Sequence, residues 1–144
     1  MRQVRAREFT YDVRLDERGV MLADGEGAID APKAWKPDHF LVAALLTCTL
    51  ESLRYHAERA GLEASGHGEG RALVTKRETD ERYAVVEIGV SCEIALEPDP
   101  GEEATAELLF KAERDCFVGA SLTVEPEYRW NVNGRAVSAR AAPS

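Results

Sequence analysis

The chain has 144 residues, of which 44% are hydrophobic and 31% are charged, a balance typical of a folded globular protein and too apolar for a disordered one. This is about one domain's length, so we expect residues 1–144 to form a single domain with a frayed tail at 136–144. The net charge of -8 argues against nucleic acids and anionic membranes as partners, because phosphate groups select surfaces rich in lysine and arginine.

The cellular compartment is predicted from the lack of a secretory signal pattern and of a membrane-spanning run in the sequence. Residues 1–8 carry basic side chains with no apolar core behind them, so we expect no secretory signal. The longest nearly apolar run, residues 40–50, is far shorter than the roughly 20 residues a membrane span requires. The three cysteines have no CxxC spacing, which argues against a zinc ribbon and a thioredoxin-type motif, and in a reducing compartment they do not make a structural disulfide framework. We therefore expect a cytoplasmic protein.

The N-terminal part predicts a β-hairpin. Apolar and polar residues alternate from Phe9 to Leu15, as in a half-buried strand. Residues 16–19 supply a turn, and residues 20–23 would run back as the second arm.

A long helix is predicted over residues 37–60. Pro37 suits a first helical turn, Asp38 complements the positive end of the helix dipole, and Gly61 is a natural stop. The first half of this helix is apolar nearly all round, which predicts burial in the core or in a subunit interface.

Two strands are expected next. The glycine-rich residues 66–70 fit neither a dinucleotide-binding nor a phosphate-binding motif, so we interpret them as a flexible connector. Residues 72–78 and 83–96 follow as strands, and the second is strongly alternating. Its pattern places Cys92 in an inward-facing row, as a core residue.

A second helix is predicted after the break at residues 98–101. Its apolar residues repeat every four positions and end at Cys116. A short helical turn to Ser121 and a final strand over residues 128–132 would complete the domain.

Two cysteine segments suggest chemistry. The first, residues 36–48, reads Lys-Pro-Asp-His-Phe-Leu-Val-Ala-Ala-Leu-Leu-Thr-Cys, with Cys48 ten residues after Asp38. The second runs from Cys116 as Cys-Phe-Val-Gly-Ala-Ser-Leu. A cysteine on an apolar helix is most often a small core residue, so the flanking residues decide the interpretation.

With these segments and this order of elements, the chain resembles the broad OsmC branch of the OsmC/Ohr family over nearly its whole length. Members typically carry Pro-Glu ten residues before the first cysteine and Cys-Pro-x-Ser near the second. Here Asp38, Phe117 and Gly119 replace the glutamate, proline and serine. The resemblance implies an α+β fold in which a strongly curved antiparallel sheet wraps the helix of residues 37–60. It also implies an intertwined homodimer whose two sites are built from both chains.

The resemblance further implies thiol-dependent reduction of organic hydroperoxides. Cys48 would attack the distal peroxide oxygen and become a sulfenic acid, and Cys116 would resolve it as an intramolecular disulfide. A dithiol reductant, such as a lipoylated protein or a laboratory thiol, would then reduce the disulfide. No bound cofactor is expected.

A thiolate at Cys48 needs help, because a free thiol has a pKa of about 8.5 and only the thiolate is nucleophilic. The family uses an arginine held by an acidic residue, and Asp38 matches the acidic position. Arg14, on the polar face of the first strand, and Arg18, in the turn, are both candidates for the arginine. The sequence does not decide between them.

Blander interpretations stay open. Asp38 also suits a simple first-turn helix acid. The substitutions at Asp38, Phe117 and Gly119 leave room for a non-catalytic protein that binds an apolar small molecule, and a redox-sensing protein is a third hypothesis. No metal site is expected, because no two of the three histidines lie three or four residues apart.

Overall fold

The computed structural model describes residues 7–23, 27–29 and 34–143. Residues 1–6, on which much of the leader prediction rests, lie outside the described residues. The chain divides into two compact units, residues 1–36 and 37–144, and each is described by itself. Among the helices described, none is long and apolar enough to cross a membrane.

The first unit is a small antiparallel sheet. Its strands β1 (Val13–Leu15), β2 (Met21–Ala23) and β3 (Gly27–Ile29) pair in the order β1-β2-β3, so the predicted hairpin is confirmed. Asp16 shapes the turn, since its carboxylate accepts hydrogen bonds from the backbone N–H groups of Arg18 and Val20. The first strand is shorter than predicted, because β2 offers partners to only three of its residues.

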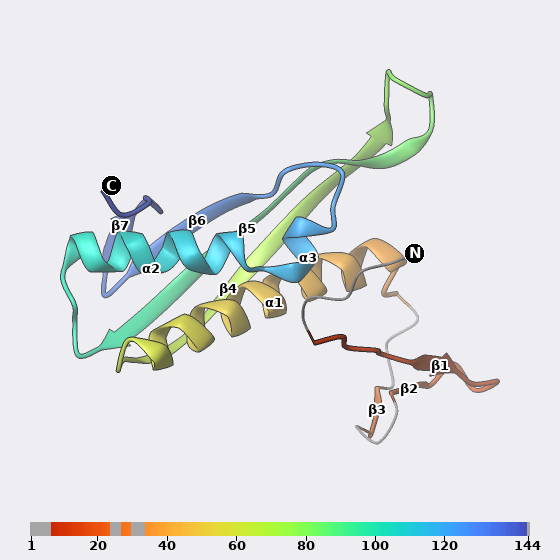
Figure 1. Cartoon of the computed structure of the whole chain (residues 1–144). Helices are drawn as coiled ribbons and strands as arrows, with labels where there is room; N and C mark the ends of the chain where they lie inside the picture. Colours follow the sequence, from red (N-terminus) through yellow and green to blue (C-terminus); the bar gives the residue numbers. More distant parts are fainter. Residues whose placement is uncertain (1–6, 24–26, 30–33, 144) are drawn as a thin grey trace. The chain divides into compact units, whose positions relative to one another are not determined.

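The second unit carries the helices and a four-stranded sheet (Figure 1). Its elements are α1 (Pro37–Arg59), β4 (Glu63–Lys76), β5 (Tyr83–Glu97), α2 (Glu102–Arg114), α3 (Phe117–Ala120), β6 (Glu127–Val132) and β7 (Arg135–Val137). The predicted α+β class and the long helix are confirmed.

The sheet is mixed and has the order β4-β5-β6-β7, rather than wholly antiparallel as expected. β6 runs parallel to β5, and the other two pairings are antiparallel. The reason is the connection: α2 and α3 form a crossover, which is the kind of link that parallel neighbours require. The last strand, β7, extends into the predicted tail, and beyond it the Arg140 N–H donates to the Ala106 carbonyl.

The glycine-rich residues 66–70 are not a connector but the middle of β4. Side chains on Gly66 and Gly68 would meet the backbone of β5, and one on Gly70 would meet Val42 of α1 at 2.6 Å. Glycine is used here because atoms of β5 and α1 lie where a side chain would be. The predicted connector was wrong because glycines that are needed for close packing give this strand the composition of a loop.

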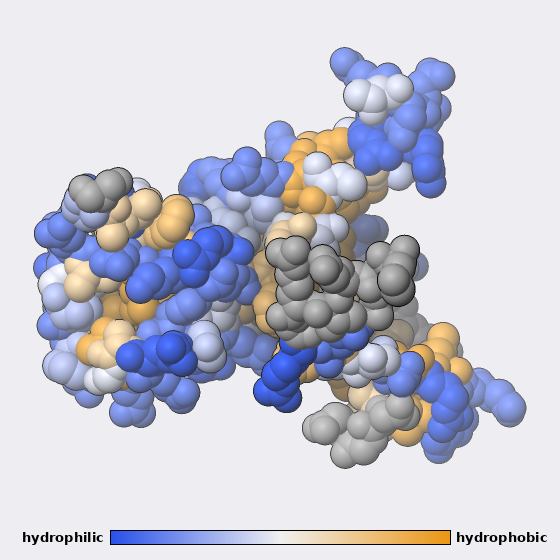
Figure 2. All heavy atoms as spheres, in the orientation of Figure 1, coloured by the Kyte–Doolittle hydropathy of each residue, from blue (hydrophilic) through white to orange (hydrophobic). Residues whose placement is uncertain are grey.

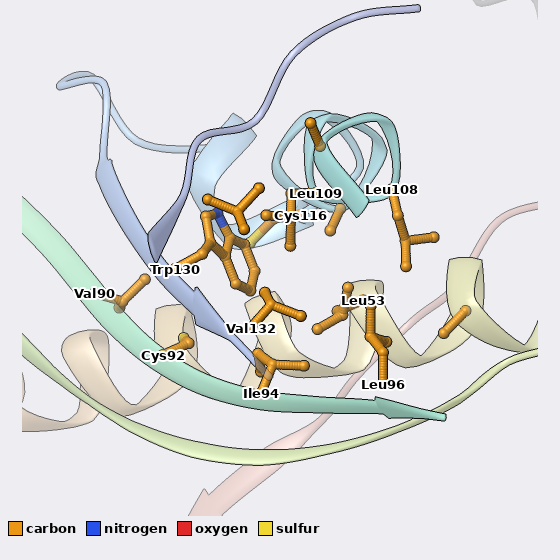
Figure 3. Packing of buried hydrophobic residues seen from close by; sticks show 14 of the residues in the cluster. Leu53, Val90, Cys92, Ile94, Leu96, Leu108, Leu109, Cys116, Trp130 and Val132 are labelled. Carbon is orange, nitrogen blue, oxygen red and sulfur yellow. The ribbon is translucent and has the colours of Figure 1, made fainter. Parts of the chain in front are cut away.

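The core lies between the helices and one face of the sheet (Figure 3). Leu45 and Leu53 of α1 are 0% and 1% exposed, and Leu109 of α2 is 0% exposed. Trp130 and Val132 of β6 contribute from the sheet, at 5% and 1% exposed. The predicted alternation of β5 is confirmed, since its inward residues are buried from Ile88 to Leu96.

Candidate active site around Cys48 and Cys116

Cys48 and Cys116 come together in the second unit. Cys48 lies on α1 and is half-buried, while Cys116 lies between α2 and α3 and is 0% exposed. Both are free thiols, and Cys116 lies near enough to Cys48 to raise its pKa. Two cysteines far apart in sequence therefore come close together, as attacking and resolving cysteines must.

The position of Cys116 is fixed by contacts on either side of it. α2 ends just before Cys116, and Asp115 caps it by donating its N–H to Lys111 O at 3.0 Å. From α1, Ser52 Oγ donates to Ala112 O at 2.8 Å, and His56 Nε2 lies 2.7 Å from Asp115 Oδ2. These contacts tie the end of α2 to the helix that carries the other thiol.

Backbone donors face the Cys48 thiol from the start of α3. The backbone N–H groups of Val118 and Phe117 act to lower the pKa of Cys48 and so favour its thiolate. Phe117 supplies an N–H that a proline at this position would lack. Burial nevertheless outweighs these donors, and Cys116 opposes ionisation too, so the pKa of Cys48 is raised above its ordinary value. The second unit alone does not activate this thiol.

Thr49 contacts Cys116 and orients its proton. Thr49 is completely buried, its hydroxyl donates to Leu45 O at 2.7 Å, and its Oγ1 lies 3.6 Å from Cys116 Sγ. Since a threonine hydroxyl has one proton, already given to Leu45, the Cys116 S–H is left to donate to Thr49 Oγ1. The remaining lone pairs of the sulfur then face other neighbours.

Tyr128 is a functional candidate that the sequence reasoning missed. Its ring stacks on Trp130, with centroids 6.4 Å apart, and its hydroxyl oxygen and Cys116 Sγ both lie beside Gly119. Burial and then Cys116 raise the pKa of Tyr128, so the phenol stays protonated as a donor. Trp130 Nε1 donates to Glu113 Oε2 at 2.8 Å. The alternation in β6 was the available signal, because it places Tyr128 and Trp130 on one face.

Cys92 is a core residue. It is 2% exposed on β5 and projects into the apolar cluster apart from the labelled Cys116 (Figure 3). Burial raises the pKa of Cys92 to about 11. A buried thiol of this kind is unreactive, as its position in the alternating strand indicates.

The predicted arginines belong to the first unit. Arg14 lies in β1 opposite Leu22, and Arg18 Nη2 is 2.9 Å from Asp16 Oδ2. Asp38 lies in the first turn of α1, about 15 Å along the helix axis from Cys48 at 1.5 Å per residue. Its carboxylate therefore acts on the thiol only through a third group, and the choice of arginine stays a prediction.

Metal sites and surface hollows are further kinds of candidate site. Over the described ranges, no group of three metal-ligating side chains is close enough to hold an ion. Two hollows, of about 860 and 360 Å³, lie along β4, β5 and β6. Neither is lined by Cys48 or Cys116.

Comparison with known proteins gives a consistent answer. A family model described as OsmC-like protein matches residues 30–131. An OsmC-like protein of unknown function from Vibrio cholerae is 14% identical, with a TM-score of 0.69, and the match covers 87% of this chain and 99% of that one. The organic hydroperoxide resistance protein OhrB of Bacillus subtilis is 22% identical, with a TM-score of 0.57 and coverage of 85% and 98%.

An OsmC-like protein from Mycoplasma pneumoniae is 17% identical, with a TM-score of 0.63 and coverage of 88% and 97%. At these identities the solved structures show a shared fold. The comparison with functionally curated proteins found no match.

Proposed function

Because the chain belongs to the OsmC-like protein family, on the match over residues 30–131, we propose that it reduces organic hydroperoxides with electrons from a dithiol. The observation that carries this proposal is that the Cys48 and Cys116 thiols lie near each other, close enough for Cys116 to raise the pKa of Cys48. Three free cysteines fit a reducing compartment, and we place the protein in the cytoplasm.

The reaction uses both sulfur atoms. The Cys48 thiolate attacks the distal oxygen of the hydroperoxide; the O–O bond breaks, and the alkoxide takes a proton and leaves as the alcohol. Cys48 is then a sulfenic acid, and Cys116 attacks its sulfur, forming the disulfide and releasing water. Two thiols of a reductant, such as a lipoylated protein, restore both cysteines and become a disulfide themselves.

Cys48 is the attacking thiol in this scheme because of its place in the fold. It is half-buried, while Cys116 is 0% exposed, so the hydroperoxide reaches Cys48. It also receives the N–H groups of Val118 and Phe117. Since burial still raises its pKa, a cation must complete the site, and an arginine positioned by Asp38 supplies it.

Arg14 is our first candidate for that cation, because Arg18 is already held by Asp16. We expect Arg14→Ala to slow iodoacetamide labelling of Cys48 at pH 7 by about tenfold, the effect of a rise of about one unit in its pKa. Arg18→Ala should have a smaller effect. Arg135→Ala removes an arginine paired with Asp99 at 3.1 Å and serves as the matched control. Unchanged labelling in both first-unit variants would show that neither arginine activates Cys48.

A homodimer explains the apolar surface of the single chain. In the first unit the exposed fractions of Phe9, Tyr11, Val13 and Leu15 are 59%, 79%, 70% and 62%. The hairpin end of β4 and β5, residues 73–83, extends past the helices and is called the β4–β5 arm (Figure 1). Here Leu73 and Tyr83 are 47% and 74% exposed. Figure 2 shows hydrophobic surface on both units, and apolar patches of this kind mark interaction sites.

We propose that a second copy of the chain covers these surfaces and that each site takes residues from both copies. Sedimentation equilibrium is expected to give twice the 15.8 kDa of one chain. Replacing Val13 and Leu15 together by aspartate should shift the mass toward the single chain, while Glu102→Lys, exposed on α2, should not. A wild-type mass of one chain at micromolar concentration would remove this part of the proposal.

The number of hydroperoxide equivalents consumed per chain tests the proposed activity. With cumene hydroperoxide and excess dithiothreitol, an enzyme consumes many equivalents. A redox sensor would consume one and then stop unless reduced slowly, and a protein that only binds an apolar molecule would consume none. The last two outcomes would each replace the peroxidase proposal.

A further inference from the structure

Gly119 leaves a space next to the thiol pair. It lies in α3, where its backbone is helical and any residue fits, so conformational freedom does not explain the glycine. An added Cβ would make ordinary contacts with Cys116 Sγ at 3.6 Å and Pro126 Cγ at 3.5 Å, but it would overlap with the hydroxyl oxygen of Tyr128. The lack of a side chain at position 119 therefore leaves room for the Tyr128 hydroxyl.

The surroundings hold the Tyr128 hydroxyl in place. The ring is stacked on Trp130 with the two planes 10° apart, and Trp130 is fixed by its hydrogen bond to Glu113. A phenol ring has only two side-chain torsions, so little freedom remains. A rigid hydroxyl next to a sulfur atom is the arrangement of a preorganised donor.

We propose that the Tyr128 hydroxyl donates to Cys116 Sγ and thereby makes Cys116 the leaving thiolate when the Cys48–Cys116 disulfide is reduced. The physiological role of that disulfide rests on the function proposed above. Thr49 does not fill this role, because its single hydroxyl proton is already given to Leu45. Tyr128 is then a catalytic residue of the reductive half of the cycle, since it touches a reacting sulfur.

Accessibility gives the step its direction. Cys116 is 0% exposed and Cys48 is half-buried, so the first thiolate of a dithiol attacks Cys48. A new S–S bond forms between the reductant and Cys48, the Cys48–Cys116 bond breaks, and its electron pair stays on Cys116. The second thiol of the reductant then attacks the reductant sulfur that is bonded to Cys48. This releases the Cys48 thiolate and leaves the reductant as a cyclic disulfide. Exchange is faster when the leaving thiolate is stabilised, which is what Tyr128 provides.

The first test compares Tyr128→Phe with wild type on a disulfide made in advance by diamide. This preparation needs no hydroperoxide, so the test stands even if the peroxidase proposal fails. We expect reduction by dithiothreitol to slow by about tenfold, the loss of one hydrogen bond to a charged group. Consumption of the first equivalent of hydroperoxide should stay within about twofold. Tyr55→Phe, which removes a hydroxyl from a tyrosine of α1 that is 56% exposed, is the matched control.

A wild-type reduction rate in Tyr128→Phe would overturn the inference. An equal slowing of the hydroperoxide step and the reduction step would also overturn it, because that pattern indicates a general disturbance of the site. The expected pattern is confined to reduction, which a purely structural role of the ring does not produce.

The second test uses the space at Gly119. Gly119→Ala should displace the Tyr128 hydroxyl and slow reduction about as much as Tyr128→Phe. In the Tyr128→Phe background the same alanine meets no hydroxyl, so it should add little further slowing. Independent, multiplying effects of the two substitutions would contradict the proposed contact.

Discussion

Cys48→Ser is expected to abolish hydroperoxide turnover, leaving less than about one part in a thousand of the wild-type rate. The reason is that a serine hydroxyl is not ionised at neutral pH and does not undergo the redox cycle of sulfur. Consumption of cumene hydroperoxide with dithiothreitol as reductant is the measurement. The change replaces one sulfur atom by an oxygen at a half-buried position, so the fold should be retained, which circular dichroism checks.

The other two cysteines give the matched variants. Cys116→Ser should still consume one equivalent of hydroperoxide, but it should leave Cys48 as a sulfenic acid that dimedone traps, with no intramolecular disulfide. Cys92→Ser should keep its turnover, because that thiol lies apart in the core. Turnover by Cys48→Ser at the wild-type rate would contradict the proposal that this protein is a Cys48-dependent peroxidase. Rapid labelling of Cys92 in the native protein would contradict its assignment to the core.

Leu109→Ala is expected to lower the free energy of unfolding by about 2–5 kcal/mol, the cost of a large-to-small change in a packed core. Leu109 lies on α2 and is 0% exposed, within the cluster between the helices and the sheet (Figure 3). Since domains are stable by only about 5–15 kcal/mol in total, this is a large fraction. Urea denaturation at one fixed protein concentration measures it, because association would otherwise shift the midpoint.

The control for that experiment is the same chemical change at the surface. Leu73 on the β4–β5 arm is 47% exposed, and Leu73→Ala should cost less than about 1 kcal/mol in a separated chain. If the two variants unfold at the same urea concentration, Leu109 is not the core residue described here. A large loss in Leu73→Ala alone would instead indicate that the arm is covered by a partner.

Much of the fold could be predicted because it depends on local chemistry. The helix of residues 37–59 follows from Pro37, Asp38 and the stop at Gly61, and β5 from its alternation of buried and exposed residues. The parallel pairing of β6 could not be predicted this way, since it is decided by how the α2–α3 crossover returns to the sheet. The order of elements fixes no strand direction by itself.

The candidate site was predictable only in part, for a related reason. Cys48 and Cys116 stood out because the residues flanking them are unusual for structural cysteines. Tyr128 carries no such mark, because an aromatic residue in an alternating strand is ordinary. Its significance depends on Gly119, and the relation between them exists only after the chain has folded.

The row of glycines in β4 has a consequence for the sulfur atoms. Leu46 and Val42 of α1 rest where side chains of Gly68 and Gly70 would be, at 3.2 and 2.6 Å from the missing Cβ atoms. The distance at which α1 packs on β4 therefore helps to set the distance between Cys48 and Cys116. Larger side chains at Gly68 or Gly70 would push α1 away from the strand, and we expect Cys48 to move away from Cys116 although neither cysteine is changed.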